Sequence, residues 1–296
     1  MDNPLFIVGL PRTGSTLWLN LVSKNPEIFG IGELLFLTPP WRKDFRYFLK
    51  NSVGDLSNEK NIRKMVDLMF SGNMTQGITA SFWQYEAPKF DTPDLRESIY
   101  HRVLESDKSL SSIFIAFIEE ISNKNGFNRC CVKFPVFVNY IPELLKWYPN
   151  CKIIHITRDP RAIAVSRAGF HGEKKIRNRE LMMLFAMAQY IWTSKLHFKY
   201  RSINNYALFR YEDLLSNPEK TIRQFCGFTE IDFDPQMLAP KEGQASSITG
   251  KKSAGFNGEA VYRWKDAITP MEEKIITAFT VKSMKRFGYE GGMVTG

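Results

Sequence analysis

The first twenty residues constrain the fold of this chain most strongly, because they join a short apolar run to a glycine-rich loop and a helix start. Residues 6–8 have the apolar character of a buried parallel strand, and Gly9 ends the run. Residues 15–22 then begin with two hydroxyl side chains and continue with the apolar period of a helix. Such a loop directs backbone N–H groups and the positive end of the helix dipole at one point. The segment is therefore predicted to bind an anion.

The spacing of this loop leaves two classes of anion-binding enzyme open. Gly9 and Gly14 are separated by four residues, which is the spacing of the P-loop. A nucleotide triphosphatase has a lysine after the second glycine, whereas this chain has Ser15 there and places its cation, Arg12, inside the loop. That composition favours an anion bound without a metal ion. A P-loop kinase that phosphorylates a small molecule remains the alternative, and an ordinary strand–helix turn is the purely structural one.

Strand and helix patterns alternate along most of the chain, which predicts βαβ units and an α/β fold. We expect a three-layer, P-loop-like domain over residues 1–296, with a central parallel sheet flanked by helices. Residues 38–128 interrupt the alternation with helical, aromatic-rich sequence, and we interpret them as a mainly helical insertion that lines an acceptor pocket. Ligands of such folds bind at the carboxyl ends of the strands, where Gly9, Lys133 and Arg158 are all predicted to lie.

A second anion-binding pattern follows the strand predicted at residues 152–157. Arg158 ends this strand, and Ser166 lies eight residues later, about two helical turns on, so that both can face one crevice. A planar guanidinium and a hydroxyl together are well suited to a phosphate monoester. The alternative is that Arg158 pairs with Asp159 or a neighbour and that Ser166 only faces a turn.

These two motifs resemble those of sulfotransferases that use 3′-phosphoadenosine 5′-phosphosulfate (PAPS). Residues 11–16, Pro-Arg-Thr-Gly-Ser-Thr, are similar to the 5′-phosphosulfate loop of that family, and the Arg158–Ser166 spacing is similar to its 3′-phosphate motif. The resemblance implies PAPS as co-substrate, adenosine 3′,5′-bisphosphate (PAP) as product, and no metal. It also implies a set of cofactor-binding residues: Arg12, Thr13, Gly14, Ser15, Thr16, Arg158 and Ser166.

Two weaker matches extend the resemblance towards the C-terminus. Residues 211–214, Tyr-Glu-Asp-Leu, resemble a segment of the family that precedes a proline-capped helix, which implies that Tyr211 contributes to the cofactor site. Lys251, Lys252 and Ser253, followed by Trp264, resemble the loop that closes over the nucleotide. Ser253 stands where the family has glycine, and the gap to Trp264 is longer, so a solvated basic loop is the alternative.

The catalytic residues are predicted from the needs of sulfuryl transfer, which are a base for the acceptor proton and cations for the transferring group. We assign the cations to Arg12 and Lys133. Many members of the family have a histidine base two residues after a strand lysine, but this chain has Lys133-Phe-Pro instead. Residues 25–33 resemble a segment of tyrosylprotein sulfotransferases whose glutamate acts as base, which implies Glu33 as base. Pairing of Glu33 with a surface lysine is the alternative, and His155 is interpreted as a core residue.

Composition limits the partners and the setting of the protein. The formal net charge of +9 favours anionic partners, but the basic residues are not clustered in one arm, so we expect no nucleic acid partner. No uninterrupted apolar run is long enough to span a membrane. The absence of a signal-like segment and four cysteines without metal-ligand spacing predict a cytoplasmic protein with reduced, buried thiols. A trimmed catalytic domain of a Golgi enzyme is the alternative. The acceptor is predicted to be a hydroxyl of a small molecule, glycan, lipid or peptide; the oligomeric state is left open.

Overall fold

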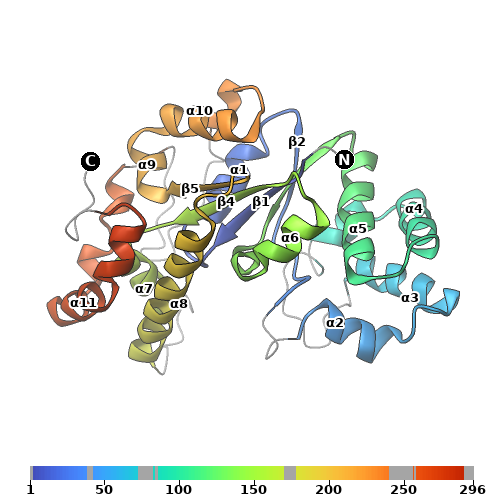
Figure 1. Ribbon diagram of the computed structural model, residues 1–296, viewed down its shortest axis with the longest axis horizontal. Coiled ribbons are helices and arrows are strands. Elements are labelled where there is room, and N and C mark those ends of the chain that lie inside the picture. The colour runs from blue at the N-terminus through green and yellow to red at the C-terminus, as the bar shows by residue number, and fades with distance from the viewer. Residues whose placement is uncertain are drawn as a thin grey trace. The chain divides into compact units, whose positions relative to one another are not determined.

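The computed structural model describes residues 3–38, 43–72, 83, 86–169, 178–239, 256 and 258–289. Within these ranges, five strands form one parallel sheet in the order β2-β3-β1-β4-β5 (Figure 1). The strands are β1 (Leu5–Gly9), β2 (Ile28–Ile31), β3 (Arg129–Lys133), β4 (Lys152–Thr157) and β5 (Tyr206–Arg210). The prediction of an α/β fold with a central parallel sheet between helices is confirmed.

The strands are parallel because each is followed by a helical connection, and their sequences suit burial on both faces. Every residue of β1 and of β3 is buried, as expected for central strands of a parallel sheet. Strand β2 pairs with β3 from Ile28 opposite Arg129 to Ile31 opposite Val132. Strand β4 pairs with β5 in the same parallel sense. All four cysteines are buried free thiols, as predicted, and burial raises the pKa of Cys130 to about 12.

The chain divides into two compact units, which we describe separately. The first comprises Met1–Phe6 and Pro26–Cys151, and the second comprises Ile7–Asn25 and Lys152–Gly296. Strand β1 therefore contributes residues to both units. Among the described residues of both, no helix is long and apolar enough to cross a membrane.

The first unit holds the segment interpreted as a helical insertion. Its helices are α2 (Phe45–Phe48), which continues as a π-helical turn over Leu49–Val53, then α3 (Glu59–Phe70), α4 (Pro93–Leu104), α5 (Leu110–Lys124) and α6 (Ile141–Trp147). Short 3₁₀ turns cover Ala87–Phe90 and Pro135–Tyr140. Aromatic side chains fill its core, and Trp83 packs against Phe117 with ring centroids 4.8 Å apart. The helical character of this segment was predictable; its contribution to an acceptor pocket stays a prediction.

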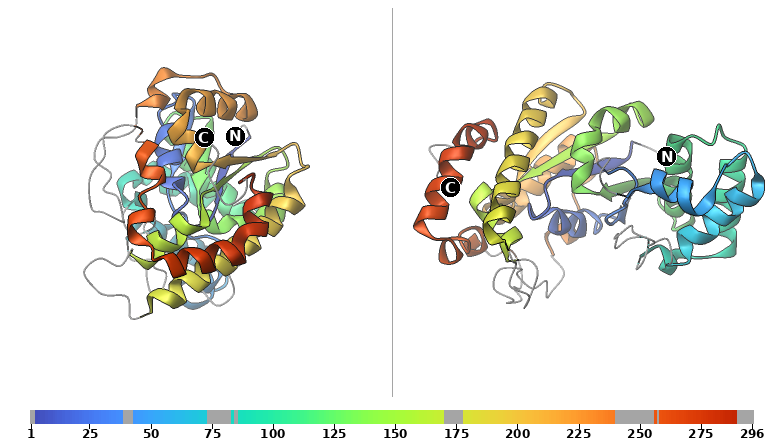
Figure 2. Two further views of the ribbon diagram at one scale, coloured as in Figure 1. Left: turned by 90° about the vertical axis from the view of Figure 1, so that its left-hand side faces the viewer. Right: turned by 90° about the horizontal axis from the view of Figure 1, so that it is seen from below.

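The second unit holds the remaining helices. They are α1 (Ser15–Val22), α7 (Pro160–Ala168), α8 (Arg179–Tyr200), α9 (Tyr211–Ser216), α10 (Pro218–Thr229) and α11 (Pro270–Arg286), with 3₁₀ turns at Pro235–Leu238, Gly258–Val261 and Lys265–Ala267. Figures 1 and 2 show α7, α8 and α11 side by side, and an apolar core joins them. Trp18 anchors α1 by packing on Phe209 of β5 and Phe225 of α10, with ring centroids 5.1 and 5.5 Å away. This packing fixes the helix that follows the glycine-rich loop.

Candidate active site

The loop between β1 and α1 is held in a conformation that requires glycine at both ends. Gly9 has a φ of 144° and Gly14 a φ of 86°. A Cβ atom on Gly9 would lie 2.3 Å from the Ile156 carbonyl oxygen, and one on Gly14 would lie 2.4 Å from the Tyr211 ring. Arg12 also has a positive φ, 79°, which is uncommon for a residue with a side chain and is characteristic of functional loops. The close approach of β4 and Tyr211 therefore sets the shape of the loop.

The start of α1 presents N–H groups that no side chain caps. Gly14 occupies the N-cap position, so it offers no side-chain acceptor, and the first turn contains no acidic residue. Thr13 is buried, and its hydroxyl donates to the Leu10 carbonyl at 2.8 Å, which braces the loop internally. The amides that no side chain caps and the positive end of the helix dipole make this terminus suitable for an anion. Ser15 at this terminus is buried and Thr16 is exposed.

The second unit brings Arg12, Arg158 and Ser166 together. Arg12 Nε donates to Ser166 Oγ at 3.0 Å, although the two residues are 154 positions apart. Arg158 Nη1 donates to the Arg12 carbonyl oxygen at 3.4 Å. The Arg12 guanidinium thus contacts the Ser166 hydroxyl, and the Arg158 guanidinium contacts the backbone of the loop. Their roles as ligand contacts stay predictions.

The Arg158 side chain is the best evidence that the site is built for an anion. The residue is 9% exposed, and its guanidinium carbon lies 4.3 Å from the centroid of the Tyr211 ring. Among the described residues, Arg158 Nε has no hydrogen-bond partner. A buried N–H of a cation without an acceptor is costly, and a phosphate oxygen would satisfy it. The alternative ion pair of Arg158 is not seen among the described residues: Asp159 pairs with Arg161 at 2.6 Å, and Arg158 forms no ion pair there.

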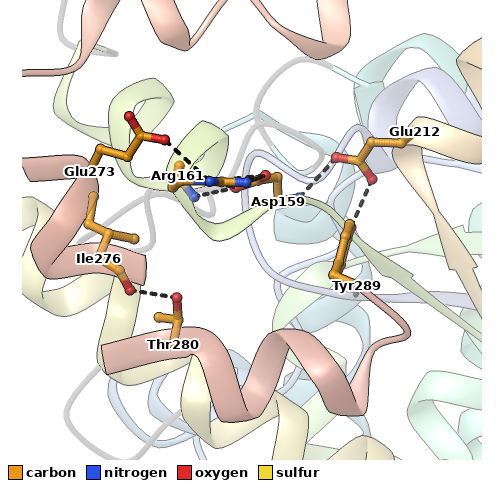
Figure 3. Close-up of polar contacts among 7 residues, drawn as sticks. All are labelled: Asp159, Arg161, Glu212, Glu273, Ile276, Thr280 and Tyr289. Carbon is orange, nitrogen blue, oxygen red and sulfur yellow. Dashed lines mark hydrogen bonds and ion pairs between the residues drawn. The ribbon is translucent and has the colours of Figure 1, made fainter. Parts of the chain in front are cut away.

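Glu212 fixes the backbone just after Arg158 (Figure 3). One of its carboxylate oxygens accepts the Asp159 N–H at 2.9 Å, and the other accepts the Tyr289 hydroxyl at 2.8 Å. The side chain is buried, and burial raises the pKa of Glu212. The first two residues of α9 therefore hold Arg158 from two sides: Tyr211 stacks on its side chain, and Glu212 accepts the N–H of the next residue, Asp159. The sequence analysis assigned a role to Tyr211 and missed Glu212.

Arg161 is a second residue that the sequence analysis missed. It is buried and donates to Asp159 and to Glu273 of α11 at 3.3 Å (Figure 3). Its guanidinium carbon lies 4.4 Å from the centroid of the Trp264 ring. The only signal was its place three residues after Arg158 in the same motif. Trp264, expected beside a loop over the nucleotide, packs in the core formed by α7, α8 and α11. Lys251, Lys252 and Ser253 lie outside the described residues.

The first unit contains the other two predicted catalytic residues, and they pair with each other. Lys133 ends β3 with its side chain 5% exposed, and its Nζ lies 2.8 Å from Glu33 Oε1. The Glu33 side chain is 48% exposed, and its Oε2 has no hydrogen-bond partner in the described part of the chain. The partner of Glu33 is thus the buried lysine assigned to the transferring group, and not a surface lysine. The pair combines a fixed cation with a carboxylate oxygen that solvent can reach.

Comparison with known proteins places the chain in a family. Residues 4–235 match the model of the sulfotransferase family. The chain belongs to this family. Its P-loop spacing is therefore that of a sulfotransferase loop, and a kinase is not favoured.

Relatives and solved structures agree with this family. Protein-tyrosine sulfotransferase 1 of Danio rerio is 25% identical over 311 residues, covering 98% of this chain and 73% of the relative. An uncharacterised protein of Aquifex aeolicus is 22% identical over 93% of this chain, and the chain spans 32% of that protein's length. The sulfotransferase domain of the Synechococcus PCC 7002 olefin synthase has a similar fold, with a TM-score of 0.61 and 18% identity over 98% of this chain and 97% of that domain.

Proposed function

We propose that this sulfotransferase-family chain uses PAPS as sulfuryl donor and transfers the group to a hydroxyl acceptor. The observation that carries the proposal is Arg158, a buried cation with an unpartnered N–H, stacked on Tyr211 and joined to Arg12 and Ser166. A 3′-phosphate would supply the missing acceptor. This group distinguishes PAPS and PAP from ordinary adenine nucleotides.

The binding roles follow from the chemistry of each group. Arg158 and Ser166 hold the 3′-phosphate, with Tyr211 supporting the Arg158 guanidinium over its ring. The loop amides at residues 12–16, with the hydroxyls of Ser15 and Thr16, hold the 5′-phosphate. Arg12 supplies positive charge where negative charge accumulates as the bond to the leaving phosphate breaks. Lys251, Lys252 and Ser253 are proposed to add contacts to the 3′-phosphate.

Glu33 is proposed as the general base. PAPS supplies the sulfuryl group, the acceptor oxygen forms the new bond to sulfur, and the bond from sulfur to the phosphate oxygen breaks. The acceptor proton passes to Glu33 Oε2, while Lys133 holds Oε1 and contributes positive charge. A tyrosyl hydroxyl is the first acceptor to test, because the Danio rerio relative is named for tyrosine.

Transfer of label from [³⁵S]PAPS to tyrosyl peptides, phenols, glycans and lipids tests the function. Glu33→Gln is expected to lower kcat about 10²–10⁴-fold while PAP affinity stays unchanged, since a positioned base contributes that much. Glu86→Gln is the matched control, because Glu86 is an exposed carboxylate of the same unit that also pairs with a lysine. Full activity of Glu33→Gln would contradict the base assignment. Absence of both transfer and PAP binding would contradict the function itself.

A further inference from the structure

Helices α8 and α11 of the second unit expose an unusual number of large apolar side chains. On α8 these are Leu181, Leu184, Phe185, Trp192 and Phe198, and on α11 they are Met271, Ile275 and Phe279. Phe279 is 67% exposed and Leu184 is 55% exposed. Single exposed apolar residues are ordinary, but clusters on one surface mark an interaction site.

The two helices run side by side in the same direction (Figure 2). Near their N-termini, Arg179 Nε donates to Glu272 Oε1 at 2.9 Å. Near their C-termini, the Arg286 guanidinium lies 5.6 Å from the centroid of the Phe198 ring. Equivalent positions along the two helices therefore lie next to each other.

Each helix has an apolar part followed by a basic part on its exposed face. The apolar part, which we call the apolar sector, comprises Leu181, Leu184, Phe185 and Trp192 with Met271, Ile275 and Phe279. The basic sector at the C-terminal ends comprises the exposed residues Lys195, Lys199, Lys282 and Lys285. Because the helices are parallel, the two apolar parts align and so do the two basic parts.

The exposed charge on these faces is strongly one-sided. Lys274 joins the four lysines of the basic sector, and Glu180 is the one exposed acidic residue on the two helices. Glu272 and Glu273 are half-buried and paired with Arg179 and Arg161. None of the five lysines forms an ion pair with any described residue. This charge pattern favours an anionic partner for the surface.

We propose that the α8–α11 surface docks on an anionic lipid bilayer, with the apolar sector in the interfacial region and the lysines on the headgroups. Helices that lie on membranes combine Trp, Phe and Leu with lysines in this way. Anionic headgroups attract each nearby lysine, and aromatic rings settle at headgroup depth. A second copy of the chain would bring the same excess of positive charge, so the charge pattern disfavours self-association through this surface. This inference is independent of the proposed function.

Flotation with lipid vesicles tests the proposal. The protein is expected to float with vesicles of phosphatidylcholine mixed with phosphatidylglycerol, and to float less with phosphatidylcholine alone or at high salt. Lys195→Glu combined with Lys282→Glu is expected to lower vesicle binding by about tenfold or more. Phe185→Ser combined with Phe279→Ser is expected to lower it similarly. Tyr47→Ser, at an exposed aromatic residue of the first unit, is the control.

The thermal unfolding midpoint of each variant, measured in parallel, reports whether the protein is folded. Vesicle binding that is equal for both lipid compositions, or that is unchanged in the charge-reversal and serine variants, would overturn the proposal. Sedimentation that shows a dimer without vesicles, broken by Phe279→Ser, would overturn it in favour of a protein interface. Loss of vesicle binding in variants whose unfolding midpoint is unchanged would support it.

Discussion

At the scale of single residues, two buried histidines make the stability of the second unit depend on pH. His155 Nδ1 lies 2.5 Å and His197 Nδ1 lies 2.9 Å from the Tyr206 hydroxyl oxygen. The hydroxyl has one hydrogen, so it donates to one imidazole and accepts from the other. Burial lowers the pKa of His155 to about 3 and that of His197 to about 4. His155 is thus the core residue that the sequence predicted.

These depressed pKa values predict a loss of stability in acid. Both histidines are neutral in the folded state, whereas the unfolded chain binds protons below a pKa of about 6.5. The folded state therefore keeps its full stability above about pH 6.5. As the pH falls from 6.5 towards 4, the free energy of unfolding decreases by roughly 1.4 kcal/mol per pH unit for each fully buried histidine. In chemical denaturation between about pH 6.5 and pH 4, the free energy of unfolding of His155→Gln should therefore change less with pH than that of the unchanged protein. The exposed His101, changed to Gln, is the control; equal slopes for both variants would contradict the interpretation.

At the scale of elements, the first turn of α7 sets the position of Arg158. Asp159 is the N-cap of this helix, its carboxylate accepts the Arg161 N–H at 2.8 Å, and it also pairs with the Arg161 side chain. Proline at the first helical position restricts the same turn. The helix start therefore depends on one buried carboxylate that also neutralises a buried cation.

Asp159→Ala is expected to destabilise the protein by about 3 kcal/mol or more, because it removes the cap and leaves Arg161 short of a buried partner. Asp159→Asn keeps the cap acceptor and should lose less. Asp234→Ala is a matched control, since Asp234 caps a half-buried 3₁₀ turn and should cost about 1 kcal/mol. Denaturant midpoints give these values. If Asp159→Ala lowers the free energy of unfolding no more than Asp234→Ala does, the pairing of Asp159 with Arg161 contributes little to stability.

The elements also show which parts of the fold local sequence determines. Periodicity predicted the strands at residues 6–8 and 152–157 and the helix at residues 15–22 close to the observed bounds of β1, β4 and α1. Helix α9 was not predicted, because Tyr211–Ser216 is short and is held by distant contacts. Glu212 lies 53 residues from Asp159, and Arg161 lies 112 residues from Glu273. Pairings of this kind are tertiary, so the sequence indicated Arg158 and Ser166 but not the residues that support them.

At the scale of the whole molecule, the predicted site residues separate between the two units. The second unit contains the residues assigned to the nucleotide, including Arg12, Arg158 and Ser166, and the first contains Lys133 and Glu33. Changes at Glu33 therefore leave every described contact of the Arg158 cluster intact. Binding and catalysis can be measured as separate properties. The proposed nucleotide site uses the positive charges of Arg12 and Arg158, and the proposed membrane surface uses those of the lysines on α8 and α11.

The most direct measurement is calorimetric titration of PAP and of adenosine 5′-monophosphate into the protein and its Arg158→Ala variant, without Mg²⁺. Arg158→Ala is expected to weaken PAP binding about ten- to a hundredfold, the effect of one charge-assisted hydrogen bond or more, and to leave binding of the monophosphate nearly unchanged. Arg223→Ala, which removes an exposed arginine paired with Glu219, should change neither. Equal weakening of both nucleotides, or preferential binding of ATP with Mg²⁺, would contradict a 3′-phosphate site at Arg158.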